Sequence, residues 1–150
     1  MKGHIRQSNL IEGIDDQKED KQSMVAWDYL KNLKQISHKD IKKVQKIITL
    51  HQPLRPDHRG YYRNVNVRVG NRLCPEWNMI PHLMANFIID WRKNNPLENH
   101  ITFEKIHPFV DGNGRTGRML MWWQQIKNGE EPTLFKADER QEYYKLFKEE

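Results

Sequence analysis

Residues 107–118 have the sequence HPFVDGNGRTGR, and this stretch decides the fold. Gly112 and Gly114 flank Asn113, so successive backbone N–H groups can curve around an anion without a Cβ clash. The sequence that follows, from about Arg115 to Lys127, predicts a helix whose unpaired N–H groups and positive dipole end point to the same place. The stretch therefore predicts an anion-binding cradle of glycines at the N-terminus of a helix.

The charged and titratable side chains of the same stretch fit a nucleotide polyphosphate that undergoes group transfer. Arg115 and Arg118 are three positions apart and so project from one face of the first helical turn, where two guanidinium groups would clamp phosphates. Asp111 is a hard oxygen ligand of the kind that holds Mg²⁺ together with substrate phosphates. His107 can accept a proton near neutral pH. A glycine turn that caps a helix, with surface arginines and a buried histidine, is the purely structural alternative.

The composition of the chain limits the class of protein. It has 150 residues, of which 25 are Lys or Arg and 20 are Asp or Glu, and its net charge is +5. Five Trp, five Tyr and five Phe supply bulky side chains for the core of one domain. A single cysteine, Cys74, excludes an internal disulfide and a cysteine-built zinc site. Because no apolar stretch has the length of a signal peptide or a membrane span, we expect a cytoplasmic chain, or one delivered to a host cytoplasm, with no membrane partner.

Five arginines concentrate the positive charge in one part of the sequence: Arg55, Arg59, Arg63, Arg68 and Arg72. Such a cluster could attract nucleic acid, the phosphates of a nucleotide or an acidic protein surface. A solvated face of one hairpin explains the charge equally well.

The N-terminal part of the chain predicts two helices. Residues 14–22 are polar and predict a loop after an N-terminal segment. Ser23 is a candidate N-cap for a helix whose apolar residues recur at helical spacing. Ser37 is a candidate N-cap for a second helix, which we expect Pro53 to stop.

The sequence between Val65 and Gly70 has a different period. Valines alternate with polar residues there, and Gly70-Asn71 supplies a turn, so we expect a strand or a hairpin of two short strands. Three more helices are expected. One starts near Asn78 and Pro81, one covers residues 97–106, and the last follows a capping box formed by Asp138 and Gln141. The sum is a mainly α fold with one small hairpin.

The stretch HPFVDGNGRTGR resembles the Fic (filamentation induced by cAMP) motif, HPF-x-D/E-GNGR-x-x-R, at every defined position. The resemblance extends over nearly the whole chain from Ser8, since RNVNVRVGN is similar to the family's flap hairpin and Tyr143-Tyr144 to its downstream tyrosine pair. It implies an all-α core with a β-hairpin flap. The N-terminal inhibitory segment and loop would then be residues 1–22 and the Fic domain residues 23–150.

The resemblance also implies an activity, because most characterised Fic proteins transfer AMP from ATP to a protein hydroxyl. His107 would deprotonate the Ser, Thr or Tyr hydroxyl of a target protein, or of the enzyme itself. Asp111 would hold Mg²⁺ between the α- and β-phosphates, and Arg118 would engage the γ-phosphate. The implied phosphate contacts come from one run of residues: Gly112, Asn113, Gly114, Arg115, Thr116, Gly117 and Arg118.

Two other regions have roles that the resemblance implies. The backbone of the flap would receive the target segment by strand addition, at residues Val67, Arg68, Val69 and Gly70. Tyr143 and Tyr144 would line the adenine pocket, although a helix that packs its aromatic face into the core explains either tyrosine equally well. Gly114 stands where the phosphotransferase branch of the family has a lysine, which favours nucleotidyl over phosphoryl transfer.

Ser8 to Gly13, SNLIEG, resemble the family's inhibitory pattern, S/T-x-x-x-E-G/N. Glu12 would pair with Arg118 and so remove the cation meant for the γ-phosphate. A helix cap with a surface glutamate is the ordinary alternative. Some relatives with such a glutamate also remove AMP from proteins, so de-AMPylation or transfer of another nucleotide remains open. A catalytically idle basic module that binds nucleotide or nucleic acid is the alternative of a different class, and the intact His107 argues against it.

Overall fold

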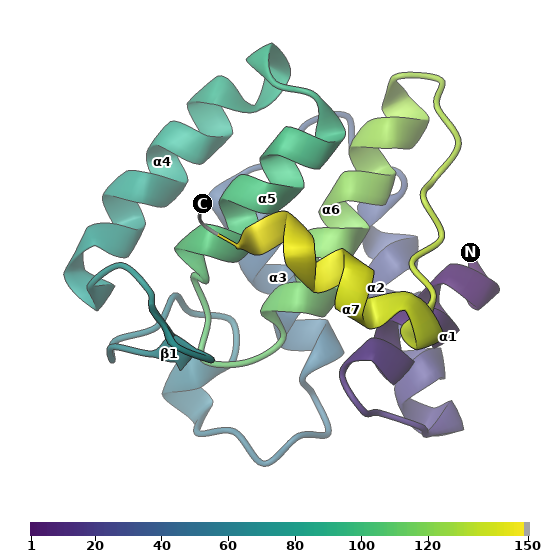
Figure 1. Ribbon diagram of the computed structural model, residues 1–150, viewed down its shortest axis with the longest axis horizontal. Helices are drawn as coiled ribbons and strands as arrows, with labels where there is room; N and C mark the ends of the chain where they lie inside the picture. The colour runs from purple at the N-terminus through teal and green to yellow at the C-terminus, as the bar shows by residue number, and fades with distance from the viewer. Residues whose placement is uncertain (149–150) are drawn as a thin grey trace.

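The computed structural model describes residues 1–148, and helices make up most of this part of the chain. Seven α-helices and one two-stranded antiparallel sheet are present there (Figure 1). Their bounds are α1 Lys2–Ile11, α2 Gln17–Leu30, α3 His38–Ile48, β1 Arg68–Val69, β2 Arg72–Leu73, α4 Ile80–Asp90, α5 Pro96–Ile106, α6 Asn113–Lys127 and α7 Arg140–Tyr144. The expected mainly α fold with a small hairpin is confirmed.

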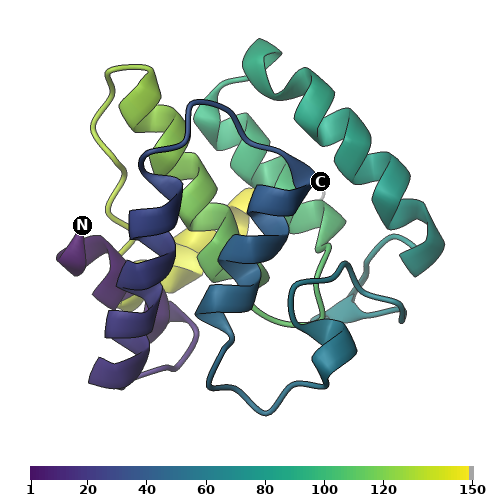
Figure 2. The same cartoon turned by 180° about the vertical axis from the view of Figure 1, so that it is seen from behind.

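Helix α6 lies at the centre of the fold. Its residues from Arg115 to Gln125 are all buried, because other helices surround it and leave it no solvent-facing stripe. Figure 1 shows α5 beside α6 and α4 beyond α5. The yellow segment that contains α7 crosses in front of α5 and α6. Figure 2 shows α2 and α3 covering the opposite side. The N-terminus of α6 and the glycine stretch before it are therefore held in place from several directions.

Local signals explain where two of the helices begin. The Ser37 side chain accepts a bond from the backbone N–H of Asp40 and the Asp40 carboxylate accepts one from Ser37, which confirms the expected cap of α3. Asn95 and Glu98 form the same reciprocal arrangement at the start of α5, with Pro96 at the first helical position. The expected helix over residues 97–106 is thus confirmed, with its start one residue earlier.

The loop expected over residues 14–22 is wrong for most of its length. Helix α2 begins at Gln17, capped by the Asp16 carboxylate, so Ser23 lies inside the helix instead of before it. The sequence hid this start because Glu19 and Ser23, which face inward, are polar. Residue 22, the expected end of the N-terminal segment, therefore lies within α2.

Two smaller expectations also need correction. Helix α3 ends at Ile48, well before Pro53, where the Thr49 hydroxyl donates to the Gln45 carbonyl. Asp138 forms no capping box, because α7 starts only at Arg140 and its N-cap makes no side-chain bond. The expected hairpin of two short strands is confirmed, with two residues in each strand. No helix among residues 1–148 is long and apolar enough to cross a membrane.

Candidate functional site

His107 occupies the corner between α5 and α6. It caps the C-terminus of α5 with φ +51° and ψ +63°, and among residues 1–148 it is the one residue other than glycine with a positive φ. This left-handed conformation costs an L-residue about 1–2 kcal/mol. Such strain persists only where neighbouring groups impose it, and it is common at functional sites.

The loop from His107 to Gly112 is held by two amide side chains. Asn113 accepts a bond from the Phe109 N–H and donates one to the Phe109 carbonyl, both at 2.8 Å. Gln45 on α3 donates to the Asp111 carbonyl at 3.1 Å. The amide of Asn113 is used for this internal pairing, so only its backbone N–H faces the cradle.

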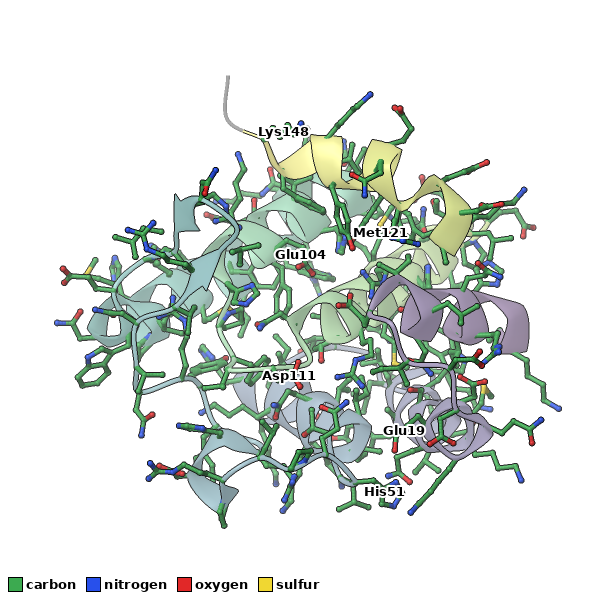
Figure 3. All side chains as sticks on the ribbon, turned by 60° about the horizontal axis from the view of Figure 1, so that its bottom comes forward. Glu19, His51, Glu104, Asp111, Met121 and Lys148 are labelled. Carbon is green, nitrogen blue, oxygen red and sulfur yellow. The ribbon has the colours of Figure 1, made fainter. Side chains whose placement is uncertain are left out.

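Gly112 is the N-cap of α6 and has φ +82°. A Cβ here would lie only 3.0 Å from the Thr49 methyl group, so both the conformation and the space require glycine. The turn aims the first N–H groups of α6 at the space beside Asp111. Figure 3 looks onto this face, with Asp111 near its middle and Glu104 on α5 beyond it.

The Asp111 carboxylate faces solvent, with 51% of its side chain exposed. One of its oxygens accepts a bond from the Gly112 N–H at 2.8 Å and lies 3.9 Å from the Arg115 guanidinium. A hard, exposed oxygen beside an anion cradle fits a Mg²⁺ ion shared with substrate phosphates. No group of three metal-ligating side chains lies together among residues 1–148.

Arg115 is buried, with spare hydrogen-bonding capacity. One nitrogen donates to the Gln52 side chain at 3.2 Å, while Nε and Nη1 are covered and have no partner in the structure. Burial lowers the pKa of its guanidinium. A buried group with unmet donors is costly unless a ligand satisfies it, and two free N–H directions suit a phosphate.

Arg118 is fully bonded from several elements. It donates to the Ser8 hydroxyl at 2.7 Å, to the Ser8 carbonyl at 3.1 Å, to the Glu12 carboxylate at 2.6 Å and to the Tyr143 hydroxyl at 3.1 Å. Burial alone would lower the pKa of Arg118, but Tyr143 and Glu12 outweigh it and raise the pKa above its usual value. The expected pairing of Glu12 with Arg118 is therefore present.

The Glu12 carboxylate lies directly over the first turn of α6. A Cβ on Gly114 would collide with a Glu12 oxygen and would lie 3.0 Å from the Arg118 guanidinium. Glu12 thus occupies the position that an anion at this helix N-terminus would take. Its side chain is 36% exposed, so solvent reaches the pair from one side.

Gly117 and Thr116 lie on other faces of α6. A Cβ on Gly117 would run into Glu104 and Phe103 of α5, so this glycine allows the two helices to approach closely. The Thr116 hydroxyl is buried and has no hydrogen-bond partner. The expected phosphate contacts of these two residues stay predictions.

The two tyrosines differ in their surroundings. Tyr143 is buried, and its hydroxyl lies 2.7 Å from His100 Nε2 as well as bonding Arg118. Tyr144 is 39% exposed. Tyr143 therefore packs in an aromatic cluster and supports Arg118, while an adenine contact from either tyrosine stays a prediction.

Buried ionisable groups surround this network. Burial lowers the pKa of His100 to about 3, with the Arg118 charge acting in the same direction. Burial raises the pKa of Glu104 to about 7, against the effect of Arg118. Burial also lowers the pKa of His107 to about 4, and the charges of Arg63 and Arg72 add to this. The His107 imidazole is thus neutral at pH 7 and able to accept a proton.

The flap, which we define as residues 65–75, projects beside His107. Arg68 pairs with Leu73 and Val69 with Arg72, and Gly70 turns the chain with φ +59°. Val69 is 41% exposed. Only Arg68 and Val69 of the expected docking strand are in regular β-structure, and docking at Val67, Arg68, Val69 and Gly70 stays a prediction.

Comparison with known proteins gives the family. The family model described as Fic/DOC matches residues 35–125. This chain belongs to the Fic/DOC family. Proteins named protein adenylyltransferase Fic from Drosophila grimshawi and Nematostella vectensis are each 30% identical to it, over 123 and 115 residues. These matches cover 76% and 67% of this chain and 25% and 27% of the relatives, so it spans about a quarter of their length.

Solved structures agree on the Fic fold. A Fic-domain-containing signaling protein from Bacteroides thetaiotaomicron aligns with a TM-score of 0.79 at 16% identity, over 97% of this chain and 70% of that one. Fic-1 from C. elegans aligns with a TM-score of 0.64 at 21% identity, over 92% of this chain and 47% of that one. At these identities the likeness shows the fold alone.

The arginine cluster of this Fic/DOC chain does not form one free basic surface. Arg63 is 1% exposed, and Arg59 and Arg72 donate to main-chain carbonyls. Arg55 pairs with Asp57 at 3.0 Å. The geometry therefore gives little support to a nucleic-acid surface in this region.

Sequence reasoning missed several residues that hold the Fic/DOC site together. Gln45 and Gln52 position the motif loop and Arg115, and His100 supports Tyr143. Their partners are distant in sequence, so no local pattern indicates them. Arg63 was visible only as one basic residue among five.

Proposed function

We propose that this chain is a protein adenylyltransferase that transfers AMP from ATP to a Ser, Thr or Tyr hydroxyl of a protein, and that Glu12 inhibits it. The observation that carries the proposal is the Glu12 carboxylate paired at 2.6 Å with Arg118 over Gly114, beside the neutral imidazole of His107. An anion-binding helix terminus held by a carboxylate of the same chain fits a competitor for phosphate. The names of the curated relatives support the same activity.

His107 acts as the general base in this proposal. Its unprotonated imidazole takes the proton of the target hydroxyl as the oxygen bonds to the α-phosphorus of ATP. The bond between that phosphorus and the bridging oxygen breaks, and pyrophosphate leaves. A pKa near 4 ensures that the base is free at neutral pH but makes it a weak one, so its position matters more than its basicity.

The phosphates of ATP would occupy the cradle. The backbone N–H groups of Asn113 and Gly114 would bind them, and that of Gly112 would do so after leaving Asp111. Arg115 offers two unpartnered nitrogens, and Arg118 would exchange Glu12 for the γ-phosphate. Asp111 would hold Mg²⁺, which when bound neutralises charge on the departing pyrophosphate. The flap would hold the target segment next to His107 by backbone hydrogen bonds.

The test uses ATP labelled at the α- or γ-phosphate and the full chain. We expect weak α-label on protein for the wild type, strong α-label for Glu12→Gly, and none for His107→Ala in the Glu12→Gly background. Glu131→Gly, at an exposed loop position, is the matched control and should label like the wild type. Asp111→Ala and chelation by EDTA should each abolish the signal of Glu12→Gly.

The other outcomes separate the alternatives. Label from the γ-position would indicate phosphoryl transfer. Equal α-labelling by the wild type and Glu12→Gly would contradict inhibition by Glu12. Release of AMP from a previously modified protein by the wild type, but not by Glu12→Gly, would indicate de-AMPylation.

A further inference from the structure

Arg63 is a buried guanidinium whose hydrogen bonds all go to the main chain. Nε donates to the His107 carbonyl at 2.7 Å, and Nη2 donates to the Ile106 carbonyl at 3.3 Å. The backbone N–H of Arg63 donates to the Pro108 carbonyl at 2.8 Å. Arg63 therefore bonds three consecutive carbonyls, those of Ile106, His107 and Pro108.

These carbonyls lie where the chain is strained. A helix leaves its last carbonyl groups without partners, and the left-handed residue that ends α5 is histidine instead of the usual glycine. Arg63 supplies the missing donors at this helix C-terminus, where the dipole also favours a cation. No carboxylate lies within ion-pair distance of Arg63 among residues 1–148, so carbonyl oxygens alone compensate its charge.

The same guanidinium bonds both ends of the flap. Nη1 donates to the Val65 carbonyl at 3.0 Å, before β1, and Nη2 donates to the Pro75 carbonyl at 2.5 Å, after β2. The base of the flap and the backbone of His107 are thus attached to one planar group. Lysine could not reproduce this arrangement. The guanidinium presents its donors in a rigid planar fork that reaches several carbonyls at once, whereas the ammonium of lysine is a single compact group.

We infer that Arg63 is a positioning residue that holds His107 in its left-handed conformation and fixes the flap relative to it. A target segment bound along the flap would then present its hydroxyl to the imidazole at a set distance. The role of His107 as the base rests on the proposed function. The attachment of the flap and the strained corner to Arg63 does not.

The kinetic test compares Arg63→Lys with Arg72→Gln, both in the Glu12→Gly background. Arg72 also lies near His107 and donates to carbonyls of α5, at Lys105 and Glu104, but not to those of residues 106–108. We expect Arg63→Lys to bind a non-hydrolysable ATP analogue as its parent does and to lose about 100-fold in kcat, since small misplacements of a catalytic group have effects of this size. Arg72→Gln removes a nearby charge and the flap's bonds to α5 without releasing the corner, so we expect it to lose clearly less kcat than Arg63→Lys.

Unchanged kcat in Arg63→Lys would overturn the inference. An equal loss in Arg63→Lys and Arg72→Gln would also overturn it, since any disturbance of the flap, and not the bonds to residues 106–108 in particular, would then be responsible. If the Glu12→Gly parent itself transfers no label, the proposed function fails, and the inference is then decided by stability alone.

The stability test needs no activity. In a double-mutant cycle, Arg63→Gln should lower the Tm more in a His107→Gly background than in the wild type. In the wild type the loss of Arg63 also lets the strained corner relax, which offsets part of the lost bonding, whereas glycine has no strain to release. We expect a difference of roughly 2–4 °C, the shift that about 1 kcal/mol of strain gives in a chain of this size. Equal Tm losses in the two backgrounds, or complete unfolding in both, would overturn the inference.

Discussion

Two buried arginines act at the two ends of residues 107–118, and they differ in their partners. Arg63 bonds the backbone at the start of this stretch, and Arg118 is its last residue. Arg118 donates to a carboxylate, a hydroxyl and a carbonyl of the N-terminal helix and to a phenol near the other end of the chain. Arg63 donates to main-chain carbonyls alone. The Glu12 carboxylate and the Ser8 hydroxyl can be exchanged for the oxygens of a ligand, whereas the carbonyls of the α5–α6 corner cannot leave without unfolding the corner.

The difference assigns distinct roles to the two sides of the site. The Arg118 side is suited to change, because its charged partner Glu12 is partly exposed and caps the C-terminus of α1, a helix at the edge of the fold. The Arg63 side is suited to stay fixed, because it holds the backbone of His107, the proposed base. Regulation through Glu12 would therefore alter nucleotide binding and leave the His107 corner as it is.

The largest expected effect comes from removing Arg118. Arg118→Ala should lower the free energy of unfolding in urea by about 3–5 kcal/mol, since it leaves a buried set of polar partners unpaired. Glu12→Gln should cost only about 1 kcal/mol, because Arg118 keeps Ser8 and Tyr143 and the glutamate is partly solvated. Equal losses in the two variants would mean that Glu12 accounts for most of the stability that Arg118 supplies, and so would contradict its role as a partner that a ligand can replace.

The next effect concerns pH and tests the His107 corner that Arg63 holds. Burial and the charges of Arg63 and Arg72 lower the pKa of His107 to about 4. The imidazole accepts a proton only when it is neutral, so AMP transfer by Glu12→Gly should rise as pH increases through about 4 and then level off toward neutrality. One pH unit below that value the rate should fall about tenfold. A midpoint near pH 6.5 in a pH–rate profile would mean that the corner is solvated and loosely held.

The smallest effect tests the partners of Arg118. Ser8→Ala removes the hydroxyl that accepts from Arg118 at 2.7 Å but leaves Glu12 in place. It should cost about 1–2 kcal/mol of stability and raise α-labelling above the wild type but below Glu12→Gly. Ser23→Ala is the control, because this buried serine bonds Asn9 instead of Arg118. Labelling by Ser8→Ala at the level of the wild type would show that Glu12 alone holds the guanidinium.

Sequence alone predicts the parts of the site that are local. His107, Asp111 and the first turn of α6 are close because a short glycine turn joins them, and SNLIEG correctly indicated that Glu12 meets Arg118. The inhibitory effect of that contact is still a prediction. A serine N-cap with helical spacing located α3, and the apolar residues between 97 and 106 located α5.

The parts that failed depend on tertiary contacts. The start of α2 was missed because polar residues face the interior there. Arg63 could not be distinguished from four neighbouring arginines, since only packing decides which one is buried. The fold class was therefore predictable, but the residue that supports the His107 backbone was not.

The contacts of Arg118 have a consequence for biosynthesis. Ser8 and Arg118 are 110 residues apart, and Arg118 and Tyr143 are another 25 apart. During translation the N-terminal helix leaves the ribosome long before Arg118 is made, so its contacts with α2 can form early and its bonds to Arg118 only after α6 has emerged. The cradle at the N-terminus of α6 and the Glu12–Arg118 contact proposed to block it are therefore completed within the same late interval of synthesis.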